Sequence, residues 1–142
     1  MSTTATEAIR KTVLVDFTPA EAFDLFTNKI ASWWPVHSHS YGGDEVTNVV
    51  FEPEVGGRVY EVTEKGEQDW GRVREWEPGR RFVLEWLIGE AHGTEVEVTF
   101  EPEGPGSRVV LEHRGFSASD PRDRYTSGWD VVLAAFVASG TS

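Results

Sequence analysis

Two side chains with acid–base chemistry fall on the apolar faces of predicted strands. Glu75 shares its face of the segment 70–77 with Val73, and His113 shares its face with Leu111. Since alternate residues of a strand point to one side, both side chains are expected to point inward. Glu75 could then accept a hydrogen bond from a ligand, or act as an acid or base with His113 as its partner.

Both residues also have a structural interpretation, and the sequence leaves the choice open. Glu75 could form an ion pair with an arginine, since paired structural carboxylates outnumber catalytic ones. An inward histidine such as His113 is more often a hydrogen-bonded core residue than a general base.

The segment between the first helix and the next strand holds further polar residues. His37 and His39 lie near Asp44 and Glu45, but alternate histidines on a loop lack the i,i+4 geometry of well-attested metal motifs. A lid over a cavity, hinged at the glycines 42–43, is the preferred hypothesis, with an ordinary turn as the alternative. No metal or other cofactor is expected.

Aromatic residues are abundant, with six tryptophans, eight phenylalanines and three tyrosines among 142 residues. They either line an apolar pocket or fill the space between sheet and helix. Trp86 and Trp129 are the strongest individual candidates, because one lies on a predicted central strand and the other on the covering helix. The predicted cavity residues are Trp34, Tyr41, Phe51, Trp70, Val73, Glu75, Leu84, Trp86, Val98, His113, Trp129, Leu133 and Phe136.

Composition excludes several classes of function. Thirteen Lys and Arg against 24 Asp and Glu give a net charge of −11 without a basic block, which disfavours nucleic acid and anionic membranes as partners. No apolar segment suits a membrane span or a secretory signal, and a cytoplasmic location is the default. The chain has no cysteine and no motif of a serine hydrolase, P-loop, zinc protease or dinucleotide fold. The acidic strand positions are predicted to be solvated surface: Glu61, Glu95, Glu97, Glu101 and Glu112.

These side chains must be positioned by a sheet and two helical regions. Ile9–Phe17 alternates as a strand, and Thr18 with Pro19 predicts the cap and first turn of a helix that breaks near 27–28. Asp120 and Pro121 predict the start of a long amphipathic helix. Six short strands lie between the helices and predict an antiparallel meander: 45–52, 58–64, 70–77, 81–88, 93–101 and 107–114.

The order and spacing of several short motifs resemble the activator of Hsp90 ATPase homologue 1-like (AHSA1-like) branch of the START/Bet v 1-like (SRPBCC) superfamily. These motifs are Glu52-Pro53-Glu-Val-Gly56-Gly57-Arg58, Gly71-x-Val73-x-Glu75-x-x-Pro78-x-x-Arg81, Trp86, Val96-x-Val98-x-Phe100, Ser107-Arg108-Val109-x-Leu111-x-His113-x-Gly115 and Gly128-Trp129. The resemblance implies an α+β helix-grip fold, in which a curved antiparallel sheet of about seven strands wraps a long C-terminal helix, with short helices after the first strand. One such domain is expected over 1–142, with its core at about 9–137.

The resemblance does not fix a reaction, because its superfamily contains carriers, aromatase/cyclases and co-chaperone domains. We expect a protein that holds a hydrophobic or aromatic small molecule between sheet and helix. A cyclase or hydrolase that uses the cavity Glu and His, or a chaperone-associated module, are the alternatives. The expected state is a monomer or a homodimer without membrane insertion.

Overall fold

One curved antiparallel sheet dominates the residues that the computed structural model describes, which are 8–34, 46–87, 92–116 and 119–140, with the side chains of 119–124 and 140 excepted. Its seven strands have the order β1-β7-β6-β5-β4-β3-β2. Their bounds are β1 Ile9–Val15, β2 Asn48–Phe51, β3 Arg58–Thr63, β4 Gly66–Glu77, β5 Arg81–Trp86, β6 Glu95–Glu103 and β7 Gly106–Arg114. From β2 to β7, each strand pairs with the strand that follows it in the chain. Strand β1 pairs with β7, so β1 and β2 are the two edge strands of the sheet.

A short helix, α1 (Pro19–Phe26), follows β1 as the sequence predicts. The hydroxyl of Thr18 accepts a hydrogen bond from the backbone N–H of Glu21, whose carboxyl group accepts one from the N–H of Thr18 in return. This capping box satisfies backbone donors that a helix start leaves open. The helix ends at Phe26, and a 3-10 turn, η1 (Ile30–Ser32), carries the chain to Trp33 and Trp34.

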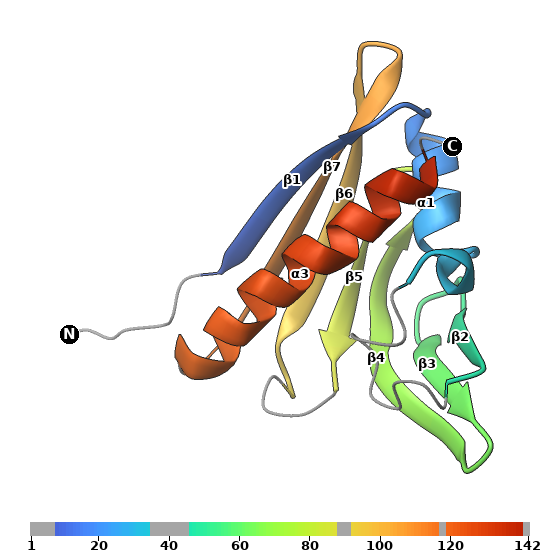
Figure 1. The fold of residues 1–142 in the computed structure, drawn as a ribbon, viewed down its shortest axis with the longest axis vertical. Helices are drawn as coiled ribbons and strands as arrows, with labels where there is room; N and C mark the ends of the chain where they lie inside the picture. Colours follow the sequence, from blue (N-terminus) through green and yellow to red (C-terminus); the bar gives the residue numbers. More distant parts are fainter. Residues whose placement is uncertain (1–7, 35–45, 88–91, 117–118, 141–142) are drawn as a thin grey trace.

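The long helix α3 (Ser119–Gly140) lies across one face of the sheet, with α1 near its C-terminal end (Figure 1). Its buried positions face the strands: Trp129, Val132, Leu133 and Phe136. An ion pair of 2.9 Å between Lys11 Nζ and Asp130 Oδ1 joins it to β1. The helix-grip α+β fold is confirmed. No helix in these described ranges is long and apolar enough to span a membrane.

Strand β4 contains two β-bulges that interrupt its alternation. Opposite β3, Trp70 is the extra residue between the pairs Val59↔Gly71 and Tyr60↔Asp69. Opposite β5, Arg74 is the extra residue between the pairs of Val73 and Glu75. A bulge shifts the following side chains to the other face. Trp70, Val73 and Trp76 therefore face the core at intervals of three.

The outer face of the sheet carries a network of ion pairs around Glu97. Arg81 Nε and Arg114 Nη1 each donate to this carboxylate at 2.8 Å. Partial burial would raise the pKa of Glu97, but the hydrogen bonds from Arg114 and Arg81 outweigh it and hold the pKa below its ordinary value. The same arginines also contact Glu75, Glu77, Glu95 and Glu112.

The capping box gives a direct test of how α1 begins. Thr18→Ala removes the side-chain acceptor and is expected to lower the free energy of unfolding by about 1 kcal/mol. Thr18→Ser keeps the hydroxyl and is the matched control, with nearly unchanged stability. Urea denaturation monitored by circular dichroism measures both, and equal stabilities of the two variants would contradict the assignment.

Candidate ligand-binding site

Four buried tryptophans from different elements form a row of ring contacts, and we call them the tryptophan row: Trp70, Trp34, Trp129 and Trp86. The ring centroids of Trp34 and Trp70 are 4.7 Å apart. Those of Trp34 and Trp129 are 6.1 Å apart and nearly perpendicular, and Trp86 lies 5.9 Å from Trp129. These separations are typical of favourable aromatic pairs. The row joins β4, the segment after η1, α3 and β5.

Three indoles of the tryptophan row donate hydrogen bonds to polar side chains. Their acceptors are Glu61 Oε1, at 2.6 Å from Trp70 Nε1, His113 Nδ1, at 3.0 Å from Trp129 Nε1, and Tyr125 Oη, at 3.0 Å from Trp86 Nε1. Buried polar groups are stable only when they are hydrogen-bonded. The apolar wall therefore contains three fixed polar points, and β3, β7 and α3 supply one each.

His113 is a neutral imidazole with a defined tautomer. Because the N–H of Trp129 can only donate, Nδ1 of His113 accepts, and the ring hydrogen belongs on Nε2. Nε2 then donates to Thr94 Oγ1 at 2.7 Å. The side chain is fully buried, and desolvation lowers the pKa of His113 to about 3. Both nitrogens are engaged, so this geometry favours the hydrogen-bonded core interpretation over that of a general base.

Burial of neutral His113 makes stability depend on pH. Its pKa is about 3 when folded against 6.5 for the ordinary group, so the unfolded chain binds more protons between these values. The free energy of unfolding must fall as the pH drops through this window, by at most about 1.4 kcal/mol per pH unit. His113→Gln can keep both hydrogen bonds without titrating, and its stability is expected to fall less steeply with acid.

Chemical denaturation at a series of pH values measures this slope. His92→Gln is the matched control, because His92 is exposed and its replacement is expected to leave the slope at the wild-type value. A His113→Gln slope equal to that of the wild type would contradict the assignment.

Most predicted cavity residues lie in the interior of the protein. Their burial does not test ligand binding, which stays a prediction. Phe136 packs on Phe26 and Trp33, and Phe51 packs on Phe82, at the end of the core nearer α1. The buried members are Trp34, Phe51, Trp70, Val73, Leu84, Trp86, Val98, His113, Trp129, Leu133 and Phe136. Tyr41 and the loop residues His37, His39, Asp44, Glu45 and the glycines 42–43 lie outside the described residues.

The prediction that Glu75 points into the interior is wrong. Its side chain is 55% exposed and forms an ion pair with Arg81 at 2.7 Å on the outer face. The bulge at Arg74 is the physical reason, because it reverses the face on which every later residue of β4 lies. Regular alternation from Val73 would put Trp76 on the outer face, but Trp76 packs on Phe23 at a centroid distance of 4.9 Å.

The prediction that Glu61 belongs to the solvated surface is also wrong. Its side chain is 1% exposed and points inward together with Val59 on β3. Strand alternation carried the signal, since residues 59 and 61 must share a face. The acidic residue type by itself suggests solvent exposure, whereas the position on β3 indicates burial. Thr94 and Tyr125 are further polar groups of the site that the sequence did not single out.

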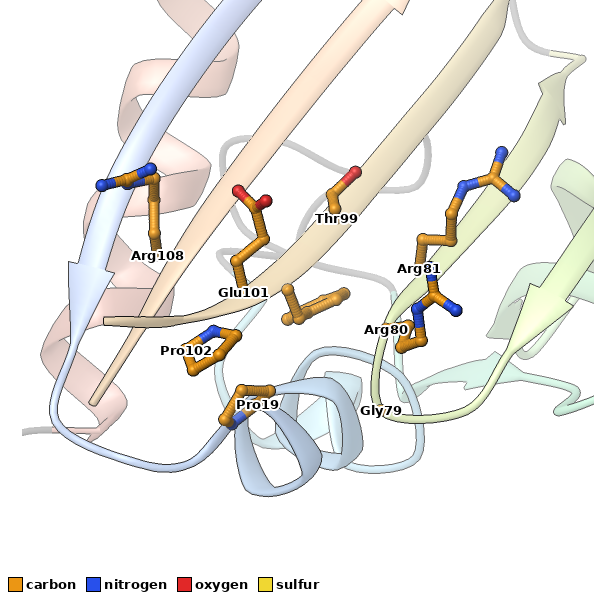
Figure 2. A pocket seen from close by; sticks show the side chains of 9 residues that line it. Pro19, Gly79, Arg80, Arg81, Thr99, Glu101, Pro102 and Arg108 are labelled. Carbon is orange, nitrogen blue, oxygen red and sulfur yellow. The ribbon is translucent and has the colours of Figure 1, made fainter. Parts of the chain in front are cut away.

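A hollow of about 450 Å³ opens at the outer face of the sheet, beside the start of α1 (Figure 2). Arg80, Arg81 and Arg108 line it, and each forms an ion pair with a glutamate. Since its cations are already paired and solvated, the hollow does not offer the apolar surroundings that an aromatic ligand needs. Its remaining lining residues are Pro19, Gly79, Thr99, Phe100, Glu101 and Pro102.

Among the solved structures similar to this chain is one of substantial sequence identity. The chain is 38% identical to Txn09, an anthrahydroquino-γ-pyrone synthase, with a TM-score of 0.57, over 78% of this chain and 77% of that one. The comparison with curated proteins gives no match.

Two other solved structures share the fold at lower identity. One is the Aha1 dimer from Colwellia psychrerythraea, with 15% identity, a TM-score of 0.70 and coverage of 95% and 96% of the two chains. The other is the AHSA1-like protein from Aeromonas hydrophila, with 20% identity, a TM-score of 0.69 and coverage of 93% and 90%. The family model described as Activator of Hsp90 ATPase homolog 1-like protein matches residues 16–139. The chain therefore belongs to the AHSA1-like family of the SRPBCC superfamily.

Proposed function

We propose that this protein binds a planar aromatic small molecule between its sheet and α3, against the tryptophan row. The observation that carries this proposal is the combination of four contacting tryptophans with three polar acceptors, of which Glu61 and His113 are buried and Tyr125 is partly buried. Flat apolar faces favour stacking, and a few fixed polar groups orient a ligand. Burial of the ligand contributes roughly 25 cal/mol per Å² of apolar surface, and each aromatic contact adds to it.

Replacing one tryptophan of the row tests the binding site. Trp34→Leu removes the indole between Trp70 and Trp129 and is expected to weaken binding of β-naphthol methyl ether about tenfold, because the ligand loses a stacking partner. Trp76→Leu is the matched control, since Trp76 is half-buried and packs on Phe23 of α1. Equilibrium dialysis measures both variants.

Circular dichroism first establishes that both variants are folded. Equal affinities of the two variants would place the ligand elsewhere. Native mass spectrometry of the freshly purified protein, compared with its denatured mass, then identifies the chemical class of any natural ligand that copurifies.

A second candidate function is ring closure on an aromatic polyketide. The identity with Txn09, over about three quarters of both chains, favours it. A γ-pyrone forms when a hydroxyl oxygen adds to a carbonyl carbon of a diketone and the adduct loses water, so no oxidant or reductant is required. This chain would contribute by holding the diketone folded between flat side chains and by excluding bulk water. The two hydrogen bonds of His113 and its burial favour a structural role for this histidine, so the candidate function does not rely on it as the proton carrier.

A model substrate tests the ring-closing candidate. An ortho-hydroxyaryl diketone is expected to cyclise to the chromone faster with the wild-type protein than with Trp34→Leu, because only the complete row holds the folded substrate. Loss of one water by mass spectrometry and the chromone absorbance follow the reaction. Equal rates with wild type, variant and buffer would remove catalysis of this kind while leaving binding in place.

The chaperone-associated alternative has less support. The likeness to the Aha1 dimer lies at 15% identity and concerns the fold alone. A dimer of this chain accordingly stays a prediction from the sequence.

A further inference from the structure

The hollow at the outer face of the sheet, beside the start of α1, has the size of a small-molecule site. Its volume is about 450 Å³, and such sites span roughly 300–1,000 Å³. No member of the tryptophan row lines it, so a ligand bound here would be independent of the interior of the protein. The hollow is therefore a second place at which this protein could hold a small molecule, and its lining determines which chemistry it suits.

Strand register brings the polar side chains of the hollow together. Thr99 and Glu101 are alternate residues of β6 and share its outer face. Arg81 on β5 lies directly opposite Thr99, and Arg108 on β7 lies directly opposite Glu101. Arg80 comes from the turn between β4 and β5. Figure 2 shows Thr99 and Glu101 between Arg108 on one side and Arg80 with Arg81 on the other. Three guanidinium groups thus line one hollow.

Several donors of this lining have no acceptor in the described part of the chain. Arg80 is 77% exposed, and its 3.6 Å ion pair with Glu77 is too long for a hydrogen bond. Arg108 donates to Glu103 through Nη2, and its other N–H groups have no acceptor among these residues. The hydroxyl of partly buried Thr99 forms no hydrogen bond among them. Three side chains of the hollow can therefore donate to a bound molecule.

Arg81 differs from the other two arginines, because carboxylates hold it against the sheet. It forms ion pairs with Glu75, Glu77 and Glu97, and so contributes mainly positive charge to the hollow. Glu101 is the acidic residue of the lining, is exposed, and forms no ion pair in the described part of the chain. The lining residues together carry three positive charges and one negative charge.

We propose that this hollow binds the oxyanion group of a small molecule, a carboxylate or a phosphate, through Arg80, Arg108 and Thr99. A guanidinium group presents its N–H donors in a fixed fork that matches two oxygens of such a group. The hydroxyl supplies one further donor. The glutamates paired with the arginines and the net charge of −11 oppose anions. The expected dissociation constant is accordingly about 1 mM, and it rises with salt.

Titration with two anions tests the site and distinguishes the two ligand classes. Sodium phosphate and sodium succinate are added separately to the isotope-labelled protein at constant ionic strength, with sodium chloride as the reference. Two-dimensional NMR is expected to show backbone amide shifts that saturate and that are largest at 79–81 and 99–101. Saturation with phosphate identifies a phosphate ligand, and saturation with succinate identifies a carboxylate ligand. Saturation with neither anion overturns the proposal.

Two substitutions in the lining are expected to act in opposite directions. Arg80→Gln removes an exposed fork of donors and is expected to weaken binding about tenfold. Glu101→Gln removes a repelling charge and is expected to strengthen binding about threefold. Each has a control with the same change of charge outside the hollow. Arg74→Gln changes an exposed arginine paired with Glu85, and Glu64→Gln changes an exposed glutamate at the opposite end of β4. Both controls are expected to leave the affinity unchanged.

The controls distinguish a defined site from a general effect of net charge. Equal weakening by Arg74→Gln and Arg80→Gln, or weaker binding by Glu101→Gln, would overturn the proposal. Circular dichroism establishes that each variant is folded. Arg108→Gln replaces Arg80→Gln if the latter does not fold, and an unchanged affinity of Arg108→Gln would then count against the site. Because the hollow lies outside the interior, none of these results bears on aromatic binding at the tryptophan row.

Discussion

The hydrogen bond from Trp129 to His113 connects the two layers of the fold inside the core. It links α3 to β7 in a region where neither partner can turn to water. The bond fixes the tautomer of His113, which in turn donates to Thr94, the residue before β6. Shifting α3 along the sheet would break this bond and leave the indole N–H of Trp129 buried without an acceptor. Because an unsatisfied buried donor is costly in free energy, the helix has one favoured register against the sheet. The position of the tryptophan row follows from that register.

The sequence predicted the elements well because each carried its own local signal. Thr18 and Pro19 marked the start of α1, and the glycine- and proline-rich turns separated the strands of the meander. The inward orientation of His113 followed from simple alternation on β7, which has no bulge opposite β6 or β1. The family resemblance then supplied the way in which these elements assemble.

The side-chain arrangement of β4 was beyond such reasoning. A bulge depends on the pairing of two strands, and nothing in the residues around Arg74 distinguishes it from regular alternation. Glu75 and Trp76 consequently exchanged the faces expected of them. Glu61 was missed for a different reason, since its position on β3 predicted burial while its charge suggested solvent. The indole of Trp70 donates the hydrogen bond that stabilises buried Glu61. Trp70 faces Glu61 only because of the other bulge of β4, the one opposite β3.

The pairing of β1 with β7 has a consequence for how the chain folds. From β2 to β7 each strand pairs with its successor, so those contacts form between residues close in sequence. Ile9, by contrast, lies opposite His113, and the chain between them must already be ordered for this pair to persist. Contacts between residues far apart in sequence slow folding, because the chain loses the entropy of loop closure before the contact contributes any favourable energy. The pairing of β1 with β7 is therefore the part of the sheet with the largest entropic cost of loop closure, whereas each pairing within the meander closes a short loop.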